Sequence, residues 1–181
     1  FRRLGIKKEN VMQRKHYVDL GNKINIRIDY NEYDEEQTGI FTTHSDYLRV
    51  IQLARLRGIT PEQQYNLREH SQDLSVRDLK ILDNELKAYK KQYGLIDFND
   101  MISEFIKSDV CPKFDTVFID EAQDLSRMQW DMATALMFNA EDAFIAGDDD
   151  QAIFRWAGAD VDSFITQTGK ILNLAQSYRV P

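Results

Sequence analysis

Short apolar runs alternate with longer helical patterns along the second half of the chain. The runs at 116–119, 143–146 and 171–174 have the length and polar flanks of strands, and the first two predict strands buried on both faces. The segments at 128–138 and 161–165 between them have helical character. Strands separated by helices are typical of a parallel sheet with crossover connections, so we expect an α/β fold here.

The first half of the chain reads as mainly helical. The clearest helix starts after Ser75, a favoured N-cap residue, and ends at Gly94, a favoured C-cap residue. Thr60, followed by proline and by glutamine three positions on, predicts the start of a shorter helix. The apolar positions of the clearest helix follow one face: Val76, Leu79, Leu82, Leu86, Tyr89 and Tyr93.

The remainder of the first half gives weaker signals. Residues 1–20 read as helical with a break at the polar run 7–10, and residues 24–30 alternate apolar and polar, which predicts a strand. The change in pattern after Gly94 places a domain boundary there. We therefore expect a mainly helical subdomain at 1–93 and an α/β part at 94–181.

Composition narrows the class of protein. The chain has 181 residues, of which 43% are hydrophobic and 29% charged, and this balance is ordinary for a soluble globular protein with one or two domains. It contains no run long enough to span a membrane and no signal peptide. The single cysteine, Cys111, excludes an internal disulfide and fits a reducing, cytoplasmic location.

Charge is unevenly distributed. Residues 1–96 contain 17 Lys and Arg against 14 Asp and Glu, whereas residues 97–181 contain 6 against 16. The acidic half suits a metal ion, and the basic half is a faint indication of a polyanionic partner. The polar face of the helix before Gly94 either follows a nucleic-acid backbone or, the reading we favour, is solvated; its cations are Arg77, Lys80, Lys87, Lys90 and Lys91.

Acidic residues follow both predicted strands of the second half. Asp120 and Glu121 come directly after the first strand, and Gly147 leads into three aspartates, 148–150, after the second. Parallel strands present their carboxyl ends at one edge of a sheet, which is where ligands bind in open α/β folds. Carboxylates at this edge need a cationic partner, so the pattern predicts a divalent metal and a phosphate.

Nearby polar residues fit nucleotide hydrolysis. In that chemistry an aspartate holds Mg²⁺ and the next carboxylate polarises the attacking water. Gln123 and Gln151 offer neutral amides near the same edge, while Arg179 would neutralise a transferred phosphoryl group and Tyr178 would stack on a base. Considered singly, each of these residues has an ordinary surface or packing role as well.

Three strings resemble motifs of one enzyme family. DEAQD, GDDDQAIFRWAGA and LNLAQSYR resemble motifs II, III and IV of superfamily 1 DNA helicases of the UvrD/Rep/PcrA type. GLIDFNDMI resembles the segment that precedes motif II in these enzymes, and FRRLG resembles the residues after their motif Ib. The resemblance is strong over 94–181 and weak over 1–93. It implies a partial RecA-like ATPase domain preceded by a helical accessory subdomain.

The resemblance also implies roles in ATP hydrolysis. Asp120 would be the Mg²⁺ ligand and Glu121 the catalytic base. Gln123 and Gln151 would couple the γ-phosphate to the DNA site. Arg179 would contact the γ-phosphate, and Tyr178 would stack on the adenine.

Two aromatic residues correspond to the family's nucleic-acid contacts. Phe154 and Trp156 match the side chains on which single-stranded bases stack, although such aromatics are more often part of a core. Stacking is independent of base sequence, as a translocating motor requires. The family usually has arginine after the tryptophan; here Ala157 stands there, so one polar contact is absent or supplied elsewhere.

Some of the family's motifs do not occur in these residues. The chain contains no G-x-x-x-x-G-K-[ST] phosphate loop and none of the motifs of a second RecA-like domain. We therefore expect an internal fragment, inactive by itself, of an ATP-dependent helicase that acts on single-stranded and duplex DNA in repair or replication. The missing parts of the parent chain would be its necessary partners.

Two other classes of function stay open at this point. A metal-dependent nuclease would use Asp120, Glu121 and the aspartates at 148–150 as a two-metal cluster. That reading leaves Gln151 and Trp156 without a role. A non-catalytic module that binds nucleic acid or protein would retain the acidic strand ends as a relic of the fold.

Overall fold

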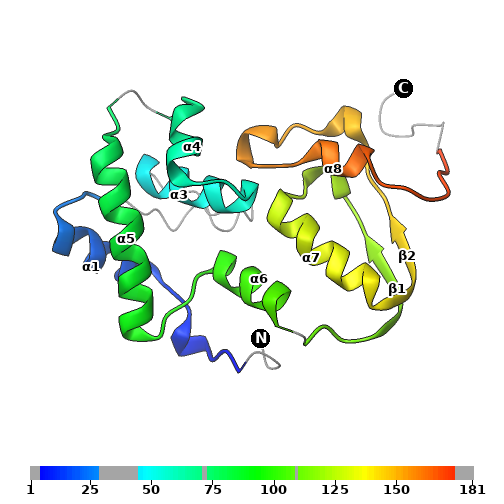
Figure 1. The fold of residues 1–181 in the computed structure, drawn as a ribbon, viewed down its shortest axis with the longest axis horizontal. Helices are drawn as coiled ribbons and strands as arrows, with labels where there is room; N and C mark the ends of the chain where they lie inside the picture. The colour runs from blue at the N-terminus through cyan, green and yellow to red at the C-terminus, as the bar shows by residue number, and fades with distance from the viewer. Residues whose placement is uncertain (1–4, 29–44, 71–72, 109, 174–181) are drawn as a thin grey trace.

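The computed structural model describes residues 5–28, 45–70, 73–108 and 110–173. Figure 1 shows a group of helices, α1 and α3 to α5, on one side and a two-stranded sheet with α7 and α8 on the other, with α6 between them. The helical segments of the first part are η2 (Lys8–Asn10), α1 (Arg14–Ile24), α3 (Asp46–Arg57), α4 (Pro61–Asn66), α5 (Val76–Tyr93) and α6 (Phe98–Lys107). The strands and helical segments of the second part are β1 (Phe114–Ile119), η4 (Ala122–Asp124), α7 (Arg127–Phe138), β2 (Ala140–Ile145), η5 (Asp149–Gln151), η6 (Arg155–Ala157) and α8 (Val161–Ile165).

The helical group is built on one face of α5. This long helix packs against α1, α3 and α4. Burial of large aliphatic side chains supplies the stabilisation, at about 1.5–3 kcal/mol for each fully buried residue. The side chains with 2% exposure or less in this core are Leu20, Leu48, Ile51, Leu79 and Leu82.

The predicted helix ends in this group are confirmed. The Ser75 hydroxyl accepts from the backbone N–H of Asp78 at 3.3 Å, and Gly94 ends α5 in the left-handed region. Thr60 and Gln63 form the predicted capping box of α4. The predicted break at 7–10 agrees with the structure, where the 3₁₀ turn η2 ends at Asn10 and α1 starts only at Arg14 and continues to Ile24.

The predicted strand at 24–30 is wrong for its described residues, 24–28. Ile24 is the last residue of α1, and Asn25 is in the left-handed region with φ 55°. The chain then folds back on its own helix, because the N–H of Ile26 donates to the Gly21 carbonyl at 3.0 Å. Ile28 is buried in the helical core, and Ile24 and Ile26 pack against that core. The alternation of apolar and polar residues therefore reflects packing on helices and not a strand of a sheet. Residues 29 and 30 lie outside the described residues.

The α/β prediction is confirmed for the second part. Strands β1 and β2 pair in parallel, with Ile119 opposite Ile145, and α7 makes the crossover between them. The third predicted strand, 171–174, is not formed at 171–173, and residue 174 lies outside the described residues. The described sheet therefore has two strands.

Burial of both strand faces is a wrong prediction. Ile119 and Ile145 pack on the α7 side, against a cluster that contains Trp130 and Ala133. On the other face Phe118 is 76% exposed and Phe144 is 55% exposed, and their rings stack at 5.0 Å. Helix α7 covers only one side of the pair, and no other described element covers the aromatic face. The apolar residues of these strands therefore do not show that both faces of the sheet are buried.

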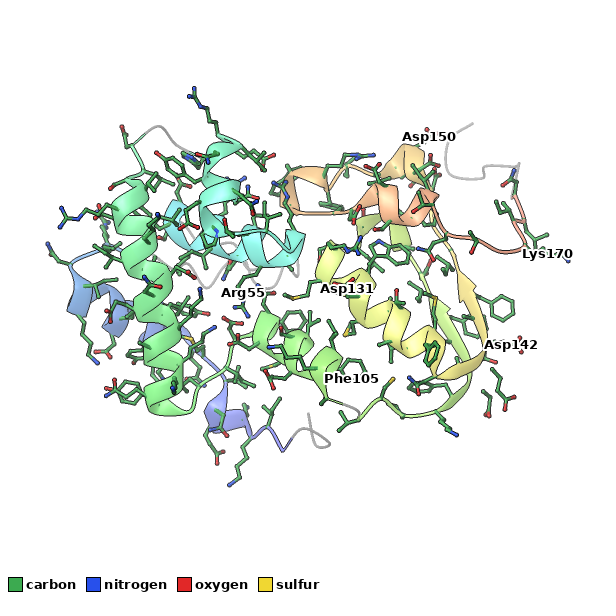
Figure 2. The ribbon with its side chains drawn as sticks, viewed as in Figure 1. Arg55, Phe105, Asp131, Asp142, Asp150 and Lys170 are labelled. Atoms are coloured by element: carbon green, nitrogen blue, oxygen red, sulfur yellow. The ribbon has the colours of Figure 1, made fainter. Side chains whose placement is uncertain are left out.

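Helix α6 joins the two parts through a buried ionic network. Its N-cap, Asp97, pairs with Lys90 of α5 and Arg55 of α3, each at 2.7 Å. Asp100 binds the same two cations. Burial by itself raises the pKa of Asp97, but the charges of Lys90 and Arg55 outweigh that effect and hold it below its usual value. Figure 2 shows Arg55 directed from α3 toward α6.

Helix α6 also packs against α7, as does α3. Gly158, at φ 102°, lies against α3, since an added Cβ there would be 3.5 Å from the side chains of Leu53 and Leu56. These contacts tie the helical group to the strand part. The domain boundary at Gly94 stays a prediction.

Candidate functional site

The carboxyl ends of β1 and β2 meet at one edge of the sheet. The ladder continues past the strands, because the Ala146 N–H donates to the Ile119 carbonyl at 2.8 Å and the Ala122 N–H donates to the Ala146 carbonyl at 3.0 Å. Asp120 and Glu121 follow β1 here, and Gly147 follows β2. Figure 2 shows Asp150 near this end and Asp142 farther back along β2. Parallel pairing thus brings together acidic segments separated by more than twenty residues.

Gln123 connects the two strand ends. Its side chain is 2% exposed; its Nε2 donates to Glu121 Oε2 at 2.7 Å, and its Oε1 accepts from the Asp148 N–H at 3.0 Å. Gly147 is required beside it, because an added Cβ would lie 2.6 Å from that Oε1. A neutral amide suits this position because it donates to one strand end and accepts from the other.

Glu121 has a strained backbone. Its φ and ψ are 49° and 41°, in the left-handed region, which costs an L-residue roughly 1–2 kcal/mol. The Glu121 N–H donates to Asp120 Oδ1 at 2.9 Å, and the Glu121 residue is exposed at the sheet edge. Strain of this kind clusters at functional positions, so it adds a structural reason to the motif for placing chemistry at this glutamate.

Gln151 lies on the loop after β2. Its Nε2 donates to Asp148 Oδ2 at 2.5 Å, and the other carboxylate oxygen of Asp148 accepts from the N–H of Asp150 at 3.1 Å. Asp148 in turn donates its N–H to Gln123. The two glutamines predicted to act together are therefore linked through one aspartate.

The acidic residues do not assemble a multi-ligand metal centre. In the described ranges no three Asp, Glu, His or Cys side chains come close enough to hold a metal ion. Mg²⁺ in phosphate sites is commonly held by one or two carboxylates together with phosphate oxygens and water. Asp120, exposed at the strand end, fits that mode of binding. The two-metal cluster of the nuclease reading is not formed by these side chains.

Asp124 is the last residue of the DEAQD string, and its position beside Gln123 suggested contacts to a neighbouring loop. Its Oδ1 is buried and has no hydrogen-bond partner. Burial, followed by the charge of Glu121, raises the pKa of this carboxyl group. The adjacent Leu125 carbonyl accepts from the Asp160 N–H at 2.8 Å. The sequence identified the residue, and only the tertiary structure shows that its carboxyl oxygen is buried.

The two predicted stacking residues lie close together. The ring centroids of Phe154 and Trp156 are 6.4 Å apart with an interplanar angle of 48°. Trp156 is 54% exposed, so it is not a core residue. Both residues are on the segment that follows Gln151, at η6. The candidate partners Tyr178 and Arg179, together with the FRRLG string up to residue 4, lie outside the described residues.

The basic face of α5 is largely paired. Lys87 binds Asp83 at 2.6 Å, Lys80 binds Glu62 at 3.4 Å, and Lys90 is buried in the network with Asp97. Three of its five cations are therefore engaged within the protein. This pattern favours the ordinary solvated face over a track for a nucleic-acid backbone.

The fold and the acidic strand ends define an α/β protein with a helical part, and comparison with known proteins gives its family. The chain belongs to the UvrD/REP helicase N-terminal domain family, whose model matches residues 3–171. It is 32% identical over 111 residues to the ATP-dependent DNA helicase PcrA of Bacillus subtilis, covering 54% of this chain and 15% of that protein.

Other relatives match at comparable levels. The RecBCD enzyme subunit RecB of Buchnera aphidicola is 33% identical over 104 residues, covering 51% of this chain and 9% of that subunit. The ATP-dependent DNA helicase Rep of the same organism is 27% identical over 135 residues, covering 67% and 20%. The chain thus spans at most about a fifth of these relatives. None of the helices in the described ranges has the length and apolar character needed to cross a membrane.

Proposed function

We propose that the intact protein couples hydrolysis of Mg-ATP to movement along single-stranded DNA and to separation of the duplex. The observation that carries the proposal is the position of Gln123, whose amide joins Glu121 to Asp148 and so to the loop that leads to Phe154 and Trp156. Membership of the helicase family and the activities for which the relatives are named support ATP and DNA as the ligands.

Each candidate residue would have a separate role in ATP hydrolysis. Asp120 would hold Mg²⁺, which neutralises charge on the phosphates when bound. Glu121 would accept a proton from the attacking water, and Gln151 would orient that water or the γ-phosphate. Arg179 would stabilise charge on the transferred phosphoryl group, and Tyr178 would stack on the adenine.

Coupling to the nucleic acid follows from the loop after β2. A change in the contacts of Glu121 reaches Asp148 through Gln123, and Asp148 also holds Gln151. The chain then passes directly to Phe154 and Trp156. Bases stacked there would contribute about 1–3 kcal/mol each without regard to sequence. Hydrolysis and strand binding would thus share one short segment.

The first experiment compares the full-length protein with its Glu121→Gln variant in ATP hydrolysis with and without single-stranded DNA. Loss of the base should lower stimulated turnover by about 10²–10⁴-fold while nucleotide binding is retained. If the wild type shows no stimulation by single strands, the motor proposal fails and a non-catalytic interaction module replaces it. Metal-dependent DNA cleavage without ATP would instead favour a nuclease.

A further inference from the structure

A pocket of about 540 Å³ lies between the helical group and the strand part. One wall is the end of α3, another is the start of α7, and the third is the turn that joins η6 to α8. Figure 2 shows Asp131, from the α7 wall, on the side that faces α3. Its lining residues are Arg57, Gly58, Arg127, Asp131, Arg155, Gly158, Ala159, Asp160 and Asp162.

Two of the three arginines hold only weak contacts. Arg127 reaches Asp131 at 3.3 Å through Nε, and Arg155 reaches Asp162 at 3.8 Å through Nη1; both arginine side chains are 58% exposed. Ion pairs between exposed side chains contribute about 0–1 kcal/mol and exchange readily with solvent. Each guanidinium has five N–H donors, so most of the donors of these two side chains remain available to a ligand.

Arg57 has a different role. Its side chain is 19% exposed, and its Nη1 donates to Glu69 at 2.5 Å and to Gln64 at 2.9 Å. Its Nη2 donates to the backbone carbonyl of Arg155 at 3.1 Å. Arg57 is therefore occupied, and it fixes the turn that carries Arg155 against the helical group. It lines the pocket but is not a free anion ligand.

The acidic residues of the pocket do not close it to an anion. Asp160 accepts from the backbone N–H of Ser163 at 3.1 Å and from its hydroxyl at 2.6 Å, so it is held as the N-cap of α8. Asp131 and Asp162 are 49% and 83% exposed and make only the long contacts described above. These two carboxylates can turn into solvent when a stronger anion binds the arginines.

We propose that Arg127 and Arg155 bind a backbone phosphate of the same strand whose bases stack on Phe154 and Trp156. This inference rests on the proposed function. Arginine binds phosphate in a bidentate manner that lysine does not reproduce. Trp156 directly follows Arg155 in η6, so the stacking ring and the pocket arginine belong to the same 3₁₀ turn, and the strand would pass from the ring to the pocket lined by Arg155.

The composition of this turn supports the assignment. From Phe154 to Gly158 the only cationic side chain is that of Arg155, since position 157 is alanine. A second cation for the strand must therefore come from another element, and Arg127 at the start of α7 lines the same pocket. A phosphate bound there would also lie against the end of α3, so strand binding would clamp the strand part to the helical group.

The test measures binding of a labelled oligo-dT strand to the full-length protein by fluorescence anisotropy, between about 50 and 200 mM salt. Each lost phosphate contact reduces the slope of log affinity against log salt by about 0.7 for a single strand. Because both arginines contact one phosphate, the double variant Arg127→Gln, Arg155→Gln should lose about 0.7 from the slope. Arg77→Gln, an exposed arginine of α5 away from the pocket, should leave the slope unchanged.

A variant of opposite sign sharpens the test. Asp131→Asn removes a carboxylate that competes for Arg127, so affinity should rise severalfold. Glu104→Gln removes an exposed carboxylate of α6, 3.6 Å from Lys107 and absent from the pocket lining, and should change affinity much less. Equal effects of these two variants would show only a general charge effect and would overturn the assignment.

The remaining outcomes separate this proposal from the proposed function. Normal strand binding and stimulated turnover, with an unchanged salt slope in the double variant, would overturn the phosphate site alone. Absence of strand binding in the wild type would overturn both. If millimolar inorganic phosphate stabilises the wild type but not the double variant while the strand slope is unchanged, the pocket takes free anions, and the proposal of a strand contact fails.

Discussion

The amide of Gln123 uses its two ends for two different hydrogen bonds, and this sets a requirement that only glutamine meets. Glutamate at this position would keep the acceptor toward the Asp148 N–H but would place a second carboxylate against Glu121. We expect Gln123→Glu to lower stability by about 1–3 kcal/mol, since a buried donor is lost. Turnover should fall by up to about 10²-fold, because Glu121 would be displaced.

A matched control is available in α7. Gln129 uses only its Oε1, which accepts from the N–H and the hydroxyl of Ser126, both at 2.8 Å. Glutamate provides the same acceptor in a capping box, so Gln129→Glu should leave melting temperature and turnover nearly unchanged. Equal behaviour of the Gln123 and Gln129 variants in thermal melting and ATP hydrolysis would contradict the two-ended role of Gln123.

Asp124 gives a prediction about pH. Its pKa is raised in the folded state, first by burial and then by Glu121, so its charged form opposes folding at neutral pH. Asp124→Asn should therefore raise the melting temperature at pH 7. The gain should shrink as pH falls through the raised pKa and disappear below the ordinary aspartate value of about 3.9, where the wild-type group is protonated in both states. A gain that does not depend on pH would argue against a buried charge.

At the level of elements, α6 depends on its N-cap for both its start and its attachment. Asp97 caps the helix and binds Arg55 and Lys90, whose side chains are 21% and 10% exposed. Asparagine keeps the cap, but Asp100 is then the only carboxylate paired with these two cations. Asp97→Asn should therefore lower the free energy of unfolding by about 3–5 kcal/mol. Because the folded pKa of Asp97 is lowered, the wild type should lose this stabilisation as pH falls below about 3.9.

Thermal or denaturant unfolding across pH checks this prediction. Glu104→Gln, which removes one partner of the exposed Glu104–Lys107 contact in the same helix, should change stability by no more than about 1 kcal/mol. If Asp97→Asn behaves like this control, the ionic network does not hold α6, and apolar packing alone attaches α6 to the helical group.

At the level of the whole molecule, we propose that the acidic strand ends form one edge of an ATP site. Its sequence contains no phosphate-loop motif, so we expect the isolated 181-residue chain to show no ATP turnover, even with single-stranded DNA present. A sensitive phosphate-release assay on the purified chain tests this expectation, with Glu121→Gln as the background control. Turnover above that background would show that the cradle for the phosphates is built in another way.

Local sequence patterns predicted the helix ends correctly where a single residue type meets a requirement of the helix terminus. Ser75 and Gly94 marked the ends of α5 because an N-cap acceptor and a left-handed C-cap are requirements of the helix itself. Parallel pairing of the runs at 116–119 and 143–146 followed from a connecting segment long enough for a crossover helix. The motifs at the ends of these strands gave the family, which the comparison confirmed.

Tertiary structure decided everything that depends on partners far apart along the chain. The alternation of apolar and polar residues at 24–28 indicated a strand, yet Ile28 is buried among helices. Such an alternation does not identify which element covers the apolar residue. The exposure of Phe118 likewise depends on which elements flank the sheet. The hydrogen bond from Arg57 to the Arg155 carbonyl joins residues 98 positions apart, and no local pattern encodes such a contact. The sequence alone determined which chemical groups follow the two strands; folding determined which of those groups are buried, strained or joined.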